Sequence, residues 1–367
     1  METLRINCSR EYDIIIGSGF LYKAGRCLTE VLPIHKVCLV SDENVRALYG
    51  GEQSAVYQSL LSAGFDVYEY SFEPGEKSKN LQTVGALLDF LASTRFSRED
   101  ALIAFGGGVT GDLAGFAAAA YMRGIRYIQM PTTLLACVDS SIGGKTGVNL
   151  PAGKNLAGTF WQPELVLADT DVFTTLTNEL WLDGLSEMVK AGMIGDPSLL
   201  KALSNTELRS LDGARMAELI LKALRVKADI VEKDERENDL RHLLNYGHTV
   251  GHALEKCSDY EVSHGRAVAA GMLITSAAAE HNGFCSKGNA ELLGNLLGKL
   301  GFDTGALRET AREIGPANLS QAALADKKTH GDTITIVYPM RPGFCKTHEF
   351  PLSMLEDFIQ SGLQFKT

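Results

Sequence analysis

Two histidines four residues apart, His248 and His252, are the side chains of this sequence best spaced to bind a metal ion. The segment 244–255 reads Leu-Asn-Tyr-Gly-His-Thr-Val-Gly-His-Ala-Leu-Glu, and a third histidine, His264, follows it. On a helix, positions i and i+4 share one face, so both imidazoles point the same way. Catalytic zinc takes three protein donors and keeps one position open. The pattern indicates a metal site, although histidine pairs at this spacing also occur on helix surfaces and in cores. Thr249 stands where the metalloprotease motif needs glutamate, which argues against peptide hydrolysis.

A glycine-rich segment follows the apolar run 101–105 and predicts a turn between a strand and a helix. Residues 106–115 read Gly-Gly-Gly-Val-Thr-Gly-Asp-Leu-Ala-Gly and satisfy the pattern G-x-G-x-x-G. Such glycines let the backbone approach a pyrophosphate, which then binds N–H groups at the start of the helix. No acidic residue lies about twenty positions further on, where the standard dinucleotide fold has its ribose carboxylate. The run 36–40 leads into Ser-Asp-Glu-Asn, which offers another ribose contact, so a variant of that fold and a purely structural turn both remain open.

A third cluster, in residues 131–133, 139–149 and 153–155, combines glycine with lysine in expected loops and predicts an anion-binding site. Glycine exposes backbone donors, and lysine adds a compact positive charge. The chain as a whole is acidic, with 45 acidic and 35 basic residues and a formal net charge of −10. We therefore expect a small, multiply charged anion and no nucleic acid, provided that the basic residues converge. These residues are Arg123, Lys145, Lys154, Lys190, Lys227 and Arg241.

Hydrophobic periodicity predicts two domains that would position these groups. Up to residue 177, short apolar runs alternate with helical stretches, which is typical of a Rossmann-like α/β domain with a mostly parallel sheet. Residues 178–367 form long amphipathic patterns, so this domain is expected to be mainly α-helical, with one strand-like run. The predicted strands are Tyr12–Ile16, Val37–Val40, Val67–Tyr70, Leu102–Phe105, Tyr127–Met130, Leu165–Ala168 and, in the second domain, Thr333–Tyr338. The clearest predicted helices are Gly213–Glu237 and Gly265–Asn282.

Composition is consistent with a globular protein of the cytoplasm. The hydrophobic content of 45% is enough for a large core. The seven cysteines are scattered without a C-x-x-C motif, as expected of free thiols in a reducing compartment. The N-terminal residues lack the apolar region of a signal peptide, and no apolar stretch reaches membrane-spanning length, so we expect no membrane partner.

A series of segments carries a similarity to known proteins: 74–79, 106–115, 131–135, 138–149, 184–190, 234–237, 240–248 and 326–328. Taken together, these segments resemble the 3-dehydroquinate synthase family of sugar-phosphate cyclases over nearly the whole chain. Many segments in the same order are far more specific than any one of them. The resemblance implies a phosphate-eliminating lyase of the shikimate pathway, a cytoplasmic homodimer that depends on NAD and on zinc, with cobalt as an alternative. Its substrate is an anionic sugar phosphate, 3-deoxy-D-arabino-heptulosonate 7-phosphate.

The resemblance also implies a role for individual residues. It assigns the metal to Glu187, His248 and His264, so that His252 leaves the metal set and becomes a proton-transfer or phosphate-contacting residue. The implied catalytic residues are Asp139, Lys190, Glu237 and His252. Substrate would be bound by Arg123 from a second subunit and by Lys145, Asn155, Lys227, Arg241, Asn245 and Lys328, with adjacent Lys327 as the alternative to Lys328. NAD would be bound by Asp42, Glu76, Lys79, Gly107, Gly108, Asp112, Thr132, Thr133, Lys154, Phe173, Thr174 and Thr175.

The implied reaction explains why such a protein needs NAD, while the metal would stabilise the negative charge that develops on substrate oxygens. Oxidation of the C5 alcohol makes the neighbouring proton acidic, phosphate then leaves, and the hydride is returned before an intramolecular aldol closure.

Two other activities stay open at this stage. Sibling cyclases that make deoxy-inosose or valiolone share the cofactors but differ in the groups that bind the substrate's carboxylate. The residues that favour a substrate with a carboxylate are present here, namely Asp139, Lys145, Arg241, Asn245 and Lys328. A polyol dehydrogenase usually has serine after the glycines, where this chain has Val109.

Overall fold

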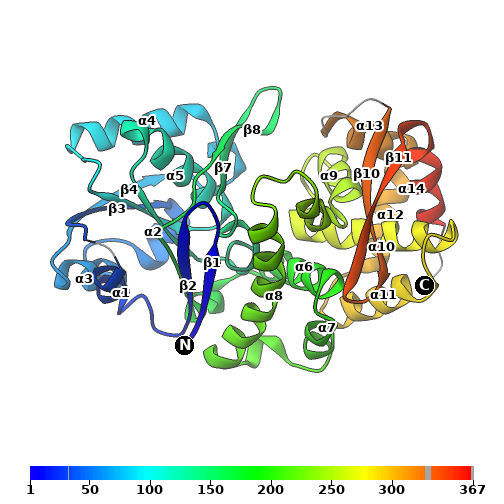
Figure 1. Ribbon diagram of the computed structural model, residues 1–367, viewed down its shortest axis with the longest axis horizontal. Helices are drawn as coiled ribbons and strands as arrows, with labels where there is room; N and C mark the ends of the chain where they lie inside the picture. Colours follow the sequence, from blue (N-terminus) through cyan, green and yellow to red (C-terminus); the bar gives the residue numbers. More distant parts are fainter. Residues whose placement is uncertain (32, 327–331, 365–367) are drawn as a thin grey trace. The chain divides into compact units, whose positions relative to one another are not determined.

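The computed structural model describes residues 1–31, 33–326 and 332–364 (Figure 1). Their contacts divide the chain into two compact units. The helix α8 (Gly213–Lys233) begins in unit 1 and ends in unit 2, and the segment before it groups with unit 1 although it lies beyond residue 177. Unit 1 comprises Met1–Leu176 and Leu211–Leu221, and unit 2 comprises Thr177–Ser210 and Lys222–Thr367.

Unit 1 is built on a seven-stranded sheet with the order β1-β2-β9-β6-β5-β3-β4. Only β1 runs antiparallel to its neighbour, so the expected mostly parallel sheet is confirmed, together with all six strands predicted in this region. The central strand β5 is buried along its whole length, which explains its uninterrupted apolar sequence. The strands are β1 (Glu2–Asn7), β2 (Glu11–Gly17), β3 (Lys36–Asp42), β4 (Asp66–Phe72), β5 (Ala101–Gly106), β6 (Arg126–Pro131) and β9 (Leu165–Asp169).

Helices and short helical turns connect these strands. The helix α5 packs on β5, on β6 and on β7 (Lys145–Leu150), and two of its glycines let it approach β6 and β7 closely. A Cβ atom at Gly115 would lie 2.4 Å from the Thr146 side chain, and one at Gly111 would lie 2.9 Å from the Gln129 side chain. These elements are α1 (Ala24–Val31), α2 (Glu43–Tyr49), α3 (Ala55–Ser62), α4 (Leu81–Ser93), α5 (Gly108–Ala120), η1 (Glu76–Ser78), η2 (Tyr121–Arg123), η3 (Ala136–Ser140) and η4 (Thr170–Thr175).

The lysine- and glycine-rich segment expected to form loops is instead an antiparallel hairpin of β7 (Lys145–Leu150) and β8 (Gly153–Phe160). Its glycines serve close backbone packing, because a Cβ atom at Gly158 would lie 2.4 Å from the Thr146 carbonyl oxygen. The hairpin is joined to the turn after η1, where the N–H of Asn149 donates to the carbonyl of Lys79 at 2.8 Å. Glu76 and Lys79, which are predicted to bind NAD, therefore lie next to the hairpin that carries the lysines of the predicted anion-binding site.

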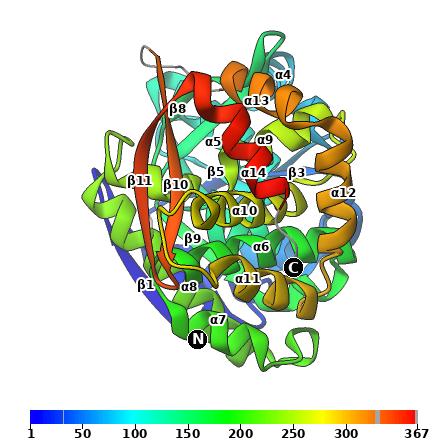
Figure 2. The ribbon, with the colours of Figure 1, turned by 90° about the vertical axis from the view of Figure 1, so that its right-hand side faces the viewer.

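Unit 2 is mainly helical, as predicted, and α10 is its central helix (Figure 2). This helix is buried along nearly its whole length and contacts α6, α9, α11, α12, α14 and β10. Its many alanines and glycines let these neighbours approach. The elements are α6 (Asn178–Ile194), α7 (Pro197–Ser204), η5 (Leu208–Ser210), η6 (Leu240–Asn245), α9 (His248–Cys257), α10 (His264–His281), α11 (Asn289–Lys299), α12 (Thr304–Ile314), α13 (Pro316–Asp326), β10 (Thr333–Arg341), β11 (Phe344–Pro351), η7 (Leu352–Met354) and α14 (Leu355–Leu363).

Two local expectations for unit 2 were wrong. The predicted lone strand pairs with a second one, β11, whose mostly exposed side chains give only a weak apolar pattern. The helix α8 ends at Lys233 and not at Glu237, because the Asp234 carboxylate accepts hydrogen bonds from the N–H groups of Asn238, Asp239 and Arg241 and folds the chain back.

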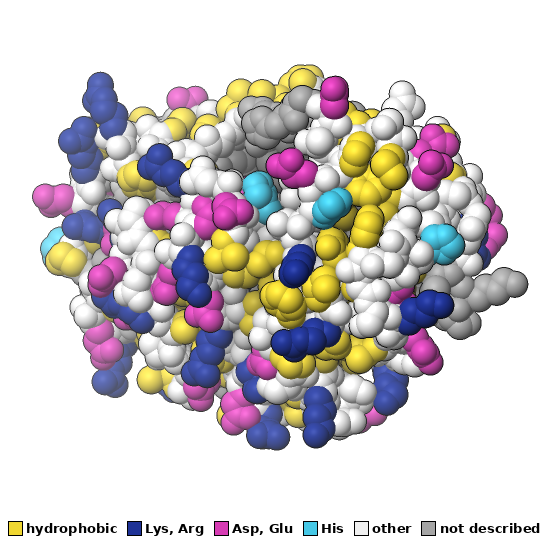
Figure 3. Space-filling model, turned by 45° about the vertical axis from the view of Figure 1, so that its right-hand side comes forward, with side chains coloured by type: hydrophobic (Ala, Val, Ile, Leu, Met, Phe, Trp, Pro, Cys, Tyr) yellow, Lys and Arg dark blue, Asp and Glu magenta, His cyan; other side chains and the backbone are white. Residues whose placement is uncertain are grey.

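The surface carries both signs of charge. On the face drawn in Figure 3, acidic and basic side chains are interspersed. Among the described residues, no helix is both long and apolar enough to cross a membrane.

Candidate active site

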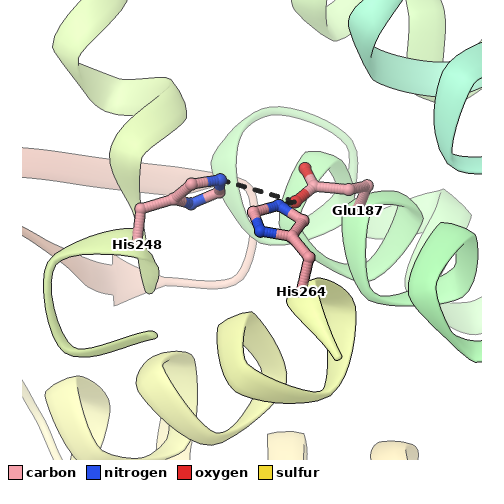
Figure 4. A group of neighbouring side chains, drawn as sticks. All are labelled: Glu187, His248 and His264. Carbon is pink, nitrogen blue, oxygen red and sulfur yellow. Dashed lines mark ion pairs between the residues drawn. The ribbon is translucent and has the colours of Figure 1, made fainter. Parts of the chain in front are cut away.

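Three helices of unit 2 bring Glu187, His248 and His264 together (Figure 4). Glu187 lies in the middle of α6, whereas His248 and His264 are the first residues of α9 and α10. An oxygen of Glu187, Oε1, is 3.6 Å from Nε2 of His248 and 3.7 Å from Nε2 of His264. The three potential ligand atoms lie within 4.8 Å of one another, a spacing that one metal ion can close.

The carboxylate of Glu187 fits a bound cation. The residue is only 3% exposed, and neither of its oxygens accepts a hydrogen bond of normal geometry from the described residues. Lys190, one turn along α6, forms an ion pair with it. Burying a carboxylate is costly unless it is paired and hydrogen-bonded, and the Lys190 ammonium contacts Oε2, which leaves Oε1 facing the two histidines. One carboxylate and two imidazoles form a donor set typical of catalytic zinc.

The ring of His248 is held in the form that binds metal through Nε2. Its Nδ1 lies 3.1 Å from the backbone carbonyl oxygen of Tyr246, which can only accept a hydrogen bond, so Nδ1 carries the proton. Burial lowers the pKa of His248 well below its ordinary value, and the nearby charges of Lys190, His252 and His264 lower it further. The ring is therefore neutral, as a metal ligand must be.

The ring of His264 is held in the same form by a carboxylate. Its Nδ1 is 3.1 Å from Oε2 of Glu255, a residue that is 7% exposed. Burial lowers the pKa of His264, but its contacts with the carboxylates of Glu187 and Glu255 outweigh this and raise it to about 10. In the protein chain by itself, a proton on Nε2 then balances the Glu187 charge, and a metal ion would displace that proton.

Further predicted catalytic and substrate residues of unit 2 lie on η6, on α8, on α9 and in the loop before η6. Arg241 is 2% exposed on η6, and Asn245 at the end of η6 donates to Oε1 of Glu237 at 3.2 Å. The ring of His252 is 5.2 Å from that of His248 and 5.8 Å from that of His264. Lys227 is buried on α8, whereas Lys328 and Lys327 lie outside the described residues.

The loop before η6 is fixed by one carboxylate. Burial acts to raise the pKa of Asp234, but the backbone N–H groups of Arg241, Asn238 and Asp239 outweigh it and lower that pKa to about 2. The loop also holds Glu237 at a positive φ of 60°. A backbone conformation of this kind costs energy, and such residues concentrate at functional sites. Arg123 and Asn155 in unit 1 also have positive φ angles, of 66° and 55°.

In unit 1, most residues predicted to bind NAD follow the carboxyl ends of neighbouring parallel strands. The end of β3 leads to Asp42, β5 leads to Gly107 and Gly108, and β6 leads to Thr132 and Thr133. Ligands of open α/β sheets bind at this edge. Gly107 is the N-cap residue of α5 and provides no side-chain cap, so the first N–H groups of that helix are available to an anion. The remaining members of the edge are Phe173, Thr174 and Thr175 on η4, after β9.

A second group of predicted NAD residues forms a polar chain beside the hairpin. Lys79, 5% exposed, pairs with Asp112 at 2.5 Å and donates to the Asn155 side chain at 2.6 Å. The backbone N–H of Asn155 donates to the Asn149 side chain at 2.9 Å, and Asn149 donates to Glu76 at 2.8 Å. Asn155, predicted to contact substrate, thus shares Lys79 with the cofactor residues.

The predicted catalytic residue Asp139, on η3, affects the pKa of Asp112, which belongs to this polar chain. Burial raises the pKa of Asp112, the Lys79 ammonium opposes the rise, and the carboxylates of Glu76 and Asp139 add to it. Lys145 and Lys154 lie on the two strands of the hairpin. Asp42 has a structural contact, because its carboxylate accepts from the N–H of Val45 and caps α2.

Sequence reasoning missed three residues that hold these groups in place. Asn149 links Glu76 to Asn155, and Glu255 holds the ring of His264. Asp183 accepts hydrogen bonds from the Ser263 hydroxyl at 2.7 Å and the Gly265 N–H at 2.9 Å, and so holds the start of α10. Asn149 and Glu255 lie inside quoted motifs, and Glu255 is seven positions after His248 on one helical face. Asp183 has no such signal.

Comparison with solved structures defines the class of protein. The 2-deoxy-scyllo-inosose synthase complexed with carbaglucose-6-phosphate, NAD⁺ and Co²⁺ matches with a TM-score of 0.85 and 24% identity over 98% of this chain and all of that chain. The 2-epi-5-epi-valiolone synthase of Streptomyces hygroscopicus, with NAD⁺ and Zn²⁺ bound, matches with a TM-score of 0.82 and 26% identity over 98% of this chain and 99% of that chain. The fold is therefore that of the sugar-phosphate cyclases.

Sequence comparison narrows this class to one family. Residues 69–183 match the family model of the 3-dehydroquinate synthase N-terminal region, and residues 184–329 match that of its C-terminal region. The 3-dehydroquinate synthase of Streptococcus sanguinis strain SK36 is 41% identical over 351 residues, which cover 95% of this chain and 97% of the relative. The chain belongs to the 3-dehydroquinate synthase family, and the resemblance seen in its motifs is confirmed.

Proposed function

We propose that the chain converts 3-deoxy-D-arabino-heptulosonate 7-phosphate to 3-dehydroquinate and phosphate, with NAD and a divalent metal ion as cofactors. The observation that carries the metal assignment is the buried Glu187 carboxylate, which faces the Nε2 atoms of His248 and His264. Family membership supports the substrate, since the identity of 41% to a 3-dehydroquinate synthase exceeds the 24% and 26% to the two cyclases of known structure.

Glu187, His248 and His264 would hold the metal ion, which we take to be zinc or cobalt. When bound, the ion supplies Lewis-acid chemistry that stabilises negative charge on a substrate oxygen. Lys190 lies one turn from Glu187 on the same face of α6 and is 3% exposed. Its ammonium is thus positioned to donate a hydrogen bond to a substrate hydroxyl beside the metal, and its buried position keeps competing water away.

Substrate recognition is assigned to the segment around η6. The guanidinium of Arg241 is planar and can bind a carboxylate with two parallel hydrogen bonds, as the proposed substrate requires. Asn245 and Glu237, joined by a hydrogen bond of 3.2 Å, would orient a hydroxyl or transfer its proton. His252 is assigned to the phosphate or to proton transfer, with Lys227 as a further substrate contact.

The strand edge of unit 1 is assigned to NAD. NAD supplies a hydride acceptor that returns the same hydride later, so no net oxidation occurs. The N-terminus of α5, at Gly107 and Gly108, would bind the pyrophosphate, and Lys79 would be oriented by Asp112 and Asn155. Asp139, Lys145 and Lys154 would bind substrate or cofactor from unit 1. We further assign Arg123 to the site of a second subunit in a homodimer.

The test is phosphate release from the heptulosonate phosphate by the purified full-length protein. Release should require NAD⁺, stop after chelation and return when zinc is added, while NADH does not accumulate. Stoichiometric NADH from a simple polyol without phosphate release would overturn the proposal in favour of a dehydrogenase. Turnover of a hexose 6-phosphate or heptulose 7-phosphate that lacks the carboxylate, without turnover of the proposed substrate, would favour a sibling cyclase.

A further inference from the structure

The two histidines of the proposed metal site are held by partners of different charge. For His248, the acceptor at Nδ1 is the neutral carbonyl oxygen of Tyr246 at 3.1 Å. For His264, the acceptor at the same distance is the carboxylate of Glu255. Both contacts leave Nε2 facing Glu187, but only the second places a negative charge behind the ring. A carboxylate makes an imidazole a more basic ligand than a neutral carbonyl does.

The backbone of His264 is fixed by a separate carboxylate. Asp183, one turn before Glu187 on α6, accepts from the residues on both sides of His264. A Cβ atom at Gly265 would lie 2.2 Å from the Asp183 Cα atom, so α6 and α10 touch at this point. The position of His264 is therefore set by α6, and the rotation of its ring is left to Glu255 on α9.

We propose that Glu255 is a positioning residue, which fixes the tautomer and orientation of the His264 ring and thereby tightens metal binding at Nε2. The inference rests on the proposed function, because it needs the metal at Glu187, His248 and His264. Glu255 is well suited to the role, since it is buried and lies on the same helix face as His248.

A different role for Glu255 has to be weighed, because His252, Glu255 and His264 also lie close enough to share a metal ion. That arrangement would use the atom of His264 that contacts Glu255 directly. The 3.1 Å contact meets the geometric criteria of a hydrogen bond, in which a proton on Nδ1 occupies the atom that a second ion would need. The geometry therefore favours a hydrogen-bonded partner over a second metal site.

The test compares Glu255→Gln with Glu261→Gln, which makes the same change at an exposed position six residues away. Each full-length protein is stripped of metal, and its zinc affinity and stoichiometry are measured by competition with a chromophoric chelator. The wild-type protein and Glu261→Gln should bind one equivalent with the same dissociation constant. Glu255→Gln keeps an oxygen that can accept from Nδ1 but loses the negative charge behind the ring, so it should bind one equivalent with a dissociation constant raised by about 10-fold, at the low end of the effect of changing an outer partner.

Three outcomes would count against the inference, and they can be told apart. An unchanged dissociation constant in Glu255→Gln would overturn it while leaving the metal site intact. A loss of stoichiometry from two to one would show that Glu255 is itself a ligand. A wild-type protein that binds no zinc would overturn the proposed function as well.

The thermal unfolding midpoint of each metal-free protein checks folding. If Glu255→Gln does not fold, Glu255→Asp takes its place; its side chain is one methylene shorter, so it should weaken zinc binding in the same direction.

Discussion

The polar groups of unit 1 and unit 2 are held in opposite ways. In unit 1, the buried ammonium of Lys79 has two partners from the protein, Asp112 and Asn155, and the chain of hydrogen bonds continues through Asn149 to Glu76. In unit 2, one oxygen of the buried Glu187 faces two ring nitrogens and accepts no hydrogen bond of normal geometry from the described residues. In the first group the protein itself supplies the partners, whereas in the second a proton on His264 balances the Glu187 charge and a metal ion would take the place of that proton.

The largest effect is expected from Glu187→Gln. The change removes the charge that a divalent ion needs, so zinc binding should be lost and phosphate release should fall by about a thousandfold, because Lewis-acid stabilisation is worth several kcal/mol. Zinc binding is measured by competition with a chelator, and activity by an assay of released phosphate. Glu179→Gln, at an exposed position of the same helix, is the control. Retained zinc binding in Glu187→Gln would remove the contrast between the two units.

Gly265→Ala tests whether the cluster of unit 2 depends on helix packing. The new Cβ would meet backbone atoms of Asp183 at 2.2 and 2.6 Å, which cannot move aside as a side chain can. We expect a loss of about 3 kcal/mol in the free energy of unfolding, at the upper end for overpacking, together with weaker zinc binding. Denaturant unfolding gives the first value. Gly85→Ala in α4, with no atom within 4 Å of the new Cβ, should instead stabilise the protein by about 0.5–1 kcal/mol. Equal stability of the two variants would contradict the argument.

Lys79→Met tests the completeness of the unit 1 group. Asp112 loses its cation, so the free energy of unfolding should fall by about 1–3 kcal/mol. NAD⁺ affinity, measured by titration calorimetry, should fall as well. Zinc affinity should stay unchanged, and a parallel loss of zinc binding would show that the two groups are not independent. The exposed neighbour Lys77 provides the control, because Lys77→Met removes the same charge from the surface.

The smallest effect is expected from Asp234→Asn, at a carboxylate that the chain itself satisfies. Its pKa is lowered from 3.8 to about 2, so its contribution to stability is present above pH 4 and is lost as the pH falls through 2. The difference in unfolding free energy between wild type and variant should be about 1 kcal/mol or less at pH 7, because solvent screens the group. Denaturant unfolding between pH 7 and pH 2 measures it. A difference that grew as the pH fell would reverse the sign and refute the assignment.

The sequence predicted much of the fold because its signals there are local. Six apolar runs became six strands of one sheet, since a run such as Leu102–Phe105 has little alternative once helices cover both faces. The sequence predicted loops where β7 and β8 form a hairpin, because Gly147 and Gly158 allow close backbone packing that only the partner strand reveals. The end of α8 was missed for a similar reason, since Asp234 stops the helix through N–H groups of residues that follow it.

For the site, the sequence by itself determined which chemistry is available: imidazoles four apart on one helix, a carboxylate and an ammonium one turn apart at Glu187 and Lys190, and glycines after a buried strand. Its motifs also determined the family. Only the tertiary structure decided which side chains meet. The start of α10 lies against α6, so Glu187 faces both His248 and His264, and Glu255 lies behind the second ring. Spacing along a chain fixes the direction of side chains within one helix, but the distance between helices depends on packing at residues such as Gly265 and Asp183, far from each other in sequence.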